Sequence, residues 1–414
     1  MGASRPSMRR GAAAAALCVA AGAIATGSGA AAVAAGGPTV PSGFSISTLA
    51  AGGSLSKPDD ITQLGNHLFV SFQNGVGAKG EPASGGGRTS TVQEFTLAGA
   101  PVARWTLTGK CDGLSADPAN NRLIAAVNED ANSSLYTISP GSATPTRFTY
   151  SPSPLPHRGG TDSISIVNGQ ILIAASAPNV ATGPAVYRAR LAGGIATLTA
   201  IFSDTSVATT ANSGGHSGKT EKLALTDPDS SEVVPSSSPR FAGDFVLDAQ
   251  GDKELVFTGN ATGSNPSLSV LHTSTEVNDT AWATATQGTL YVTDNASNSL
   301  LAIRGTFSPG TAYSAVPKDS SLNPGTVGTL NLKTGTVTPF ATGLGSPAGV
   351  LFVPDPTASA PQVSATPAGG VATGDYSTSR TPVSLLTTGS ALLLLLLLVA
   401  GAVAVAGRRR LRRR

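Results

Sequence analysis

Five aspartates stand at the same offset of a recurring pattern, each at the start of a short apolar segment. They are Asp59, Asp112, Asp162, Asp244 and Asp279. Carboxylates brought together in one place repel one another, and a hard cation such as calcium, which takes roughly six to eight oxygen ligands, offsets that repulsion. An aspartate at the start of a strand also accepts hydrogen bonds from its own turn. The pattern therefore predicts a metal site with calcium as the cofactor, five local turn caps, or carboxylates that act directly in catalysis.

Two further reactive side chains, His157 and Arg158, lie just before Asp162 in the same segment. A histidine beside a carboxylate can act as acid and base, and an arginine can hold a carboxylate or phosphate. We take His157 and Arg158 as candidate ligand-binding residues. The alternative is a surface loop with solvated charges.

A long stretch, 203–239, separates two of the apolar segments and is expected to be an inserted loop. Within it, the alternation of Asp227, Asp229 and Ser231 imitates part of a calcium-binding EF-hand loop. Pro228 and the missing central glycine depart from that motif. We do not expect an EF-hand here.

The elements that must position the aspartates recur six times. Each copy pairs a short apolar strand with a second β-rich strand, and turn residues such as Gly65-Asn66 and Asn168-Gly169 separate the two. The paired segments are 58–61 with 68–70, 111–114 with 123–125, 161–164 with 171–173, 243–246 with 255–257, 278–281 with 290–292, and 347–350 with 351–353. Repeated hairpins of this kind predict the blades of a propeller.

The fold class predicted from this pattern is all-β, with a six-bladed β-propeller over residues 43–353. Seven blades or a β-sandwich are the alternatives. Charged residues make up only 12% of the chain, while Gly (49) and Pro (28) are abundant, which favours turns and short strands over surface helices. The isolated strand 44–50 is expected to complete the last blade and close the ring, which removes open sheet edges.

The aspartate-x-aliphatic openings and the Asn/Gly hairpins resemble those of NHL-like and lactonase-like propellers of secreted bacterial proteins. That resemblance implies a calcium-dependent lactonase-like hydrolase with its site at the mouth of the central channel. Asn128, Asn278 and Asn295 would then add neutral oxygen ligands. The glutamate that lactonase-like propellers carry early in the first blade has no counterpart near Asp59.

Both ends of the chain carry export and anchoring signals. Residues 1–34 have a basic start, an apolar run and small-residue cleavage positions, as a signal peptide does. Residues 354–384 are rich in Pro, Ala, Thr and Ser and predict a disordered stalk. Residues 390–407 are apolar and long enough to form one transmembrane helix, and the basic tail 408–414 holds the C-terminus in the cytoplasm.

Residues 385–389, just before the apolar stretch, resemble a sortase sorting signal of the LPxTG type. The resemblance rests on Leu385, Thr388 and Gly389, and it implies cleavage after Thr388 and attachment to peptidoglycan. Leu386 departs from the pattern, which places Pro or Ala there.

These features predict a cell-surface protein outside the membrane, most simply a binding or scaffold module for a surface ligand, with the hydrolase as the alternative. Sortase, peptidoglycan and the membrane are the expected partners. The net charge of +3 comes from the arginines of 408–414. No basic face is therefore expected in the body, and nucleic acid is not an expected partner.

Overall fold

Strands make up almost all of the regular structure in the part of the chain that the computed structural model describes, residues 37–176, 183–318 and 325–356. Within these ranges there are 26 strands and a single short 3-10 helix, η1 (Pro118–Asn120). The prediction of an all-β fold is confirmed. No helix among the described residues has the length and apolar composition needed to span a membrane. The predicted signal peptide, sorting signal, transmembrane segment and basic tail, and all but the start of the stalk, lie outside the described residues.

The first sheet shows how the local pattern builds each unit. Its four strands follow chain order and pair antiparallel: β2 (Pro58–Leu64), β3 (His67–Phe72), β4 (Thr89–Thr96) and β5 (Pro101–Thr108). Gly65, at the first hairpin turn, has a φ of +60°, and Asn168 and Gly169 at a later one have φ of +50° and +74°. Two-residue turns of this kind need positive φ, which Asn and Gly adopt at little cost. The predicted hairpin turns at these positions are confirmed.

The next eight strands form two such units that share one sheet. The first unit is β6 (Cys111–Asp117), β7 (Arg122–Val127), β8 (Ser134–Ile138) and β9 (Thr146–Ser151). The second is β10 (Gly160–Val167), β11 (Gln170–Ser176), β12 (Pro184–Ala192) and β13 (Ile195–Ser203). A short parallel pairing of β9 with β13 joins their outer edges.

The fourth unit corrects the prediction that 203–239 is a loop. That stretch contains β14 (Val207–Thr210), β15 (Thr220–Lys222) and β16 (Pro228–Val233). The sheet is completed by β17 (Phe245–Ala249), β18 (Glu254–Gly259) and β19 (Ser267–His272). The innermost strand is β16, so the segment 243–246 begins the second strand of the unit, not the first. The prediction was wrong because β16 is polar and lacks the apolar run used to find the other inner strands.

The last two sheets are interleaved along the chain. One contains β20 (Asp279–Trp282), β23 (Ala312–Val316), β24 (Thr326–Leu330) and β25 (Val337–Ala341). The other contains β26 (Pro347–Pro354), β21 (Gln287–Asp294), β22 (Ser299–Thr306) and β1 (Phe44–Ala51). The predicted pairing of 278–281 with 290–292 is wrong, because β20 pairs with β23 and β21 pairs with β26. Residues 347–353, predicted as two strands, form one.

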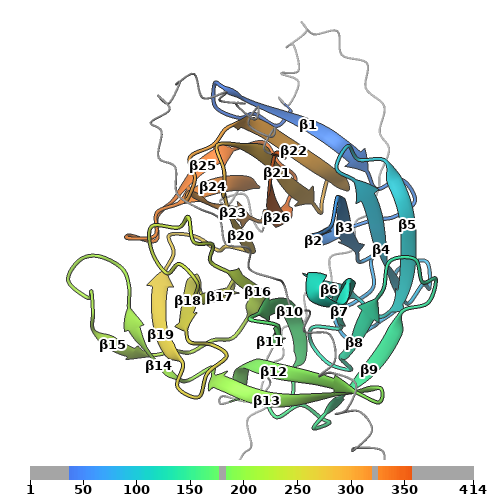
Figure 1. Cartoon of the computed structure of the whole chain (residues 1–414), viewed down its shortest axis with the longest axis horizontal. Helices are drawn as coiled ribbons and strands as arrows, with labels where there is room; N and C mark the ends of the chain where they lie inside the picture. Colours follow the sequence, from blue (N-terminus) through green and yellow to red (C-terminus); the bar gives the residue numbers. More distant parts are fainter. Residues whose placement is uncertain (1–36, 177–182, 319–324, 357–414) are drawn as a thin grey trace, which may run out of the picture. The chain divides into compact units, whose positions relative to one another are not determined.

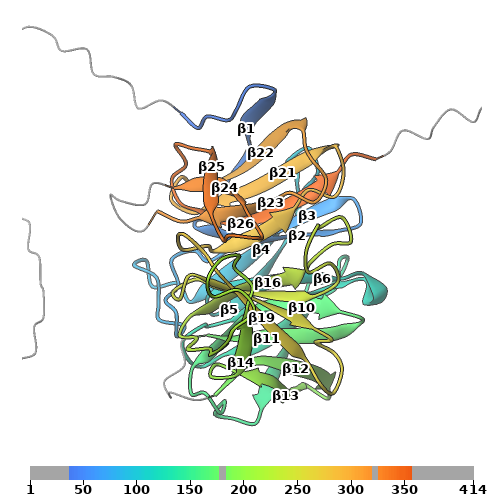
Figure 2. The same ribbon diagram turned by 90° about the vertical axis from the view of Figure 1, so that its left-hand side faces the viewer.

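Strand β1 pairs with β22 at the outer edge of the sheet that contains β26, so the predicted closure by the N-terminal strand is confirmed. Figure 2 shows β1, β22 and β21 side by side in that order.

Six inner strands surround a common centre. In order they are β2, β6, β10, β16, β20 and β26; each contacts the next, and β26 contacts β2 (Figure 1). The arrangement is propeller-like. All the described residues belong to one compact unit, Met1–Thr357.

Hydrophobic cores lie between neighbouring sheets. Phe69 and Trp105 of the first unit pack in one cluster with Leu123 of the second, while Ile61 packs with Tyr291 across the closure of the ring. Because each sheet buries both faces against its neighbours, the inner strands are held at fixed positions around the centre.

Candidate functional site

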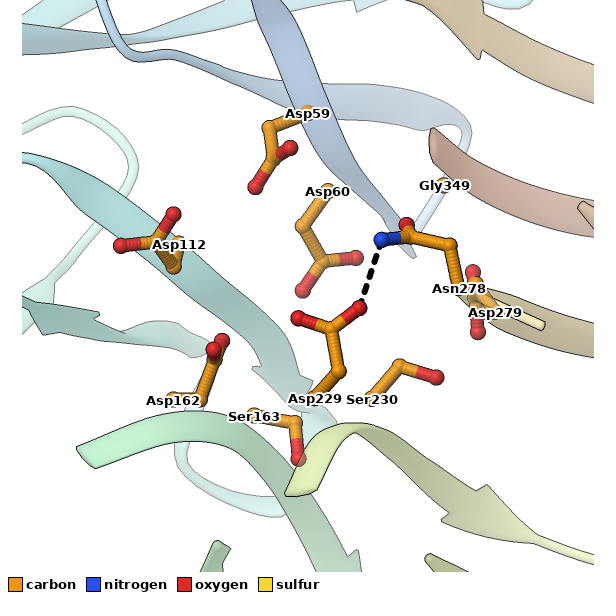
Figure 3. A pocket seen from close by; sticks show the side chains of 10 residues that line it. All are labelled: Asp59, Asp60, Asp112, Asp162, Ser163, Asp229, Ser230, Asn278, Asp279 and Gly349. Atoms are coloured by element: carbon orange, nitrogen blue, oxygen red, sulfur yellow. Dashed lines mark hydrogen bonds between the residues drawn. The ribbon is translucent and has the colours of Figure 1, made fainter. Parts of the chain in front are cut away.

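A small cavity lies at one end of the inner strands, and six carboxyl groups line it. We call it the acidic chamber (Figure 3). Its lining residues are Asp59, Asp60, Asp112, Asp162, Ser163, Asp229, Ser230, Asn278, Asp279 and Gly349. Its volume is about 20 Å³, which is room for one water molecule or one ion. Each of the six inner strands contributes at least one of these residues.

Irregular strand pairing explains why two successive residues of one strand both reach the chamber. In β2, β6, β10 and β16 the register to the second strand shifts across the chamber residues, at 58–61, 111–114, 161–164 and 228–231. A β-bulge of this kind breaks the strict alternation of side chains and turns an extra one toward the centre. The chamber therefore has two tiers.

The first tier contains the residues that line only the chamber. They are Asp59, Asp112, Asp162, Asp229, Asn278 and Gly349. The second tier also borders the channel beyond the chamber, and it contains Asp60, Ser163, Ser230 and Asp279.

Four of the five aspartates predicted as metal ligands lie in the chamber: Asp59, Asp112, Asp162 and Asp279. Asp244 does not, because it precedes β17, the second strand of its unit, and Asp229 of β16 takes its place.

Asp279 belongs to the second tier, next to Asn278 in the first. Sequence reasoning missed Asp60 and Asp229. The signal for Asp229 was a proline followed by aspartate at the start of a strand, the same order as Pro58 and Asp59.

The carboxylates of Asp60 and Asp279 accept hydrogen bonds from backbone N–H groups and so link neighbouring inner strands. Asp60 Oδ1 accepts from Ile61 N (2.7 Å) and Oδ2 accepts from Leu114 N of β6 (2.6 Å). Asp279 makes the equivalent pair of bonds, with Thr280 N (2.8 Å) and Val350 N of β26 (2.7 Å). Each carboxylate therefore caps its own turn, the role predicted for aspartates at strand starts, and also binds the backbone of the adjacent inner strand.

Asp112 of the first tier is only partly satisfied. Its Oδ1 accepts from Gln73 Nε2 (2.8 Å) and lies 2.9 Å from Lys110 Nζ. Its Oδ2 is buried without a hydrogen-bond partner, as is Ser163 Oγ, and both residues are 4% exposed. Buried polar atoms without a protein partner are rare, and such an atom is available to bind a ligand.

Two other contacts hold the first tier in place. Asn278 Nδ2 donates to Asp229 Oδ2 at 2.6 Å (Figure 3). The Lys110 ammonium also pairs with Glu129 outside the chamber. Burial acts to lower the pKa of Lys110, but Asp112, Glu129 and Asp59 raise it well above its usual value, so the ammonium stays charged.

Burial raises the pKa of the chamber carboxyls. It brings the pKa of Asp59 to about 6, against the opposing effect of Lys110. The pKa of Asp279 is likewise raised to about 6 by burial. For Asp112, Asp162 and Asp229 the pKa is raised well above its usual value by burial and by neighbouring acids. Burial therefore opposes ionisation of these carboxyls, and a bound cation would favour it.

The chamber fits a hard cation in the kind of donor it offers. Carboxylate, hydroxyl and amide oxygens surround the cavity, and calcium prefers oxygen ligands. No group of three or more His, Cys, Asp or Glu side chains among the described residues already stands at metal-holding geometry. A bound ion would therefore require the first-tier carboxylates to rotate inward.

The other sequence-predicted residues lie away from the chamber. His157 is completely buried: its Nε2 donates to Gly160 O and its Nδ1 accepts from Tyr187 OH, both at 2.6 Å. A carbonyl can only accept, which fixes this tautomer, and burial lowers the pKa of His157. His157 therefore contributes to packing, and the alternative of a solvated side chain does not describe it. Arg158 is exposed and lines a separate groove.

Of the three asparagines considered as neutral ligands, only Asn278 lines the chamber. Asn128 Oδ1 instead accepts from Lys110 N (2.9 Å). The Asn295 backbone N–H donates to Ser346 O (2.9 Å).

No family model and no curated protein matches this chain. Similar solved structures include the periplasmic gluconolactonase PpgL of Pseudomonas aeruginosa, with 13% identity, a TM-score of 0.42, and coverage of 72% of this chain and 89% of that chain. Streptogramin B lyase has 11% identity, a TM-score of 0.38, and coverage of 75% and 94%. A protein of unknown function from Bacteroides thetaiotaomicron has 10% identity, a TM-score of 0.40, and coverage of 74% and 70%.

Proposed function

We propose that this chain is a six-bladed β-propeller that binds one divalent cation, calcium, in the acidic chamber and serves as a binding module outside the cell. The observation that carries the proposal is Asp112 Oδ2, a buried carboxylate oxygen without a partner, in a cavity that admits one ion. The count of six blades rests on the ring of six inner strands.

Calcium would act on stability through the first tier. The carboxylates of Asp59, Asp112, Asp162 and Asp229 come from four different inner strands. An ion held by several of them would release their protons and cross-link the strands around the centre. A ligand that binds only the folded state stabilises that state.

The test is thermal unfolding of the full chain in detergent, with calcium and with EDTA. We expect calcium to raise the Tm by several degrees, since a saturating ligand contributes about 3 kcal/mol at a hundredfold excess over its Kd. Asp112→Asn should remove most of the shift. Asp244→Asn is the matched control and should keep it, because Asp244 lies outside the chamber. A wild-type Tm that does not respond to calcium would refute the proposed site.

The proposed location follows from the two ends of the chain. A signal peptide at 1–34 would export the propeller, a stalk at 354–384 would hold it away from the membrane, and a helix at 390–407 would retain it. Cleavage at Leu385–Gly389 by a sortase would transfer it to peptidoglycan. Such an arrangement displays a rigid body to a surface ligand, as a binding or scaffold module requires.

The calcium-dependent hydrolase is the alternative function. The chamber, at about 20 Å³, has room for an ion but not for an organic substrate beside it. A lactone would have to bind above the first tier, against Asp112 and Lys110. Calcium-dependent hydrolysis of a lactone panel that is lost in Asp112→Asn would favour the enzyme over the binding module.

A further inference from the structure

A second, larger cavity continues from the acidic chamber into the ring. We call it the lower channel. It has a volume of about 330 Å³ and shares the second-tier residues with the chamber. That volume falls at the lower end of the range for pockets that hold small organic molecules, roughly 300–1,000 Å³. The second tier therefore separates an ion-sized space from a molecule-sized one.

Glu232, near the end of β16, is the carboxyl of the lower channel that the protein leaves unsatisfied. Its Oε1 is buried and has no hydrogen-bond partner. The other two carboxyls of the cavity wall, Asp60 and Asp279, already accept backbone N–H groups with both oxygens.

The groups that face Glu232 from the neighbouring strands are all acidic: Asp279 of β20, Asp248 of β17 and Asp60 of β2. Burial and these three acids raise the pKa of Glu232 well above its usual value. Asp248 Oδ2 accepts from Thr280 Oγ1 (2.9 Å). A positive charge entering the channel would therefore meet Glu232 as its counter-ion.

The walls of the lower channel are amphipathic. Partly exposed aliphatic side chains from three inner strands, Ile166, Val233 and Leu351, line it together with hydroxyls such as Thr62 and Ser115. An alkyl chain buries apolar surface against the former, and an ammonium group donates hydrogen bonds to the latter. Val233, at the end of β16, lines the cavity and is 38% exposed, so it offers apolar surface that a bound alkyl chain could cover.

We propose that the lower channel binds a small aliphatic primary ammonium ion, with its charged group paired to Glu232 and its alkyl chain against Ile166, Val233 and Leu351. The inference rests on the propeller ring of the proposed function but not on calcium in the acidic chamber.

The test compares two probes of equal length, pentylammonium chloride and 1-pentanol, by titration calorimetry with the full chain in non-ionic detergent near neutral pH. We expect the amine to bind at least about tenfold more tightly than the alcohol, equivalent to about 1.4 kcal/mol. Glu232→Gln, which keeps the shape of the side chain, should abolish that preference. Glu81→Gln, on an exposed residue outside the cavity, should retain it.

Further measurements separate this site from the calcium site and from misfolding. Glu232→Gln should leave the calcium-dependent Tm shift intact, whereas Asp112→Asn should remove that shift and retain amine binding. In the wild type, the preference for the amine should fall as the pH is lowered, because Glu232 regains its proton. Equal affinity for the two probes, an unchanged preference in Glu232→Gln, or a preference independent of pH would each overturn the proposal.

Discussion

Hydrogen bonds give the same residue type two different roles at the centre of this protein. Asp60 and Asp279 each accept two backbone N–H groups and connect neighbouring inner strands. Asp112 keeps one buried oxygen without a partner. A carboxylate satisfied by the backbone stabilises the fold, whereas one left unsatisfied is available to a ligand and destabilises the site until the ligand arrives.

The raised pKa of Asp59, about 6, predicts a particular pH dependence of stability. Between its ordinary value of 3.8 and 6, the folded state holds a proton that the unfolded state has lost. The free energy of unfolding therefore falls as the pH rises through this window and levels off above it. Above pH 6, metal-free Asp59→Asn should be more stable than the wild type by on the order of 1–3 kcal/mol.

Urea unfolding in EDTA across this pH range measures the effect of Asp59. Asp130→Asn, on a residue outside the chamber, is the control and should follow the wild-type profile. If Asp59→Asn loses stability above pH 6, the carboxylate is stabilised by its surroundings and the electrostatic account of the chamber is wrong.

At the scale of elements, β-bulges and the closing strand position the site. The bulges of β2, β10 and β16 bring two consecutive residues each to the chamber, and the bulge of β6 brings Asp112. Strand β1 completes the sheet that contains β26. The ring of Phe44 on β1 packs edge-on against the rings of Phe307 and Phe340, with distances between ring centroids of 5.1 Å and 4.9 Å. Phe340 belongs to β25, in the neighbouring sheet, so this one side chain connects both sheets of the interleaved pair.

Removing the Phe44 ring should weaken the closure. We expect Phe44→Ala to lower the free energy of unfolding by about 3 kcal/mol, at the low end for large buried aromatics, because Phe44 is only partly buried. Urea unfolding measures the loss. Val102→Ala on β5, where the side chain is 52% exposed, is the control and should change stability little. A loss below about 1 kcal/mol would mean that β1 contributes little to closing the ring.

At the scale of the whole molecule, two features of the chain path connect the last sheets of the ring. Strand β1 joins the last sheet from the N-terminal side, and β20 enters one sheet before β21 and β22 complete the next. The strands of the two final sheets are therefore interleaved along the chain. Residue 356, the last described before the predicted anchor, follows β26, an inner strand of the ring.

The proposed anchor gives a prediction for the full chain in its native cell. If a sortase transfers the protein to the wall at Thr388, Thr388→Ala should make it extractable by detergent, while the wild type should require digestion of the wall. Thr387→Ala is the neighbouring control and should behave as the wild type. Equal extraction of the wild type and Thr388→Ala would show that the protein is held by its apolar segment alone.

Local sequence determined much of this fold. Turn residues such as Asn168-Gly169 and the short apolar runs identified most strands, because both signals depend on a few neighbouring residues. The same local pattern brought Asp59, Asp112 and Asp162 to the chamber, since each stands at the start of an inner strand. The closing role of residues 44–50 followed from the lack of a nearby partner strand.

Only the tertiary structure decided which strands pair and which carboxylate completes the chamber. Strands of similar apolar pattern compete for the same neighbours, and the choice depends on packing between residues far apart in sequence, so β20 with β23 and β21 with β26 could not be read locally. Asp244 was predicted in place of Asp229 because Asp229 lies on β16, a polar strand without an apolar run that could identify it from the sequence. The division of the carboxylates into satisfied and unsatisfied groups also needed the structure, because it depends on backbone N–H groups of the adjacent strand.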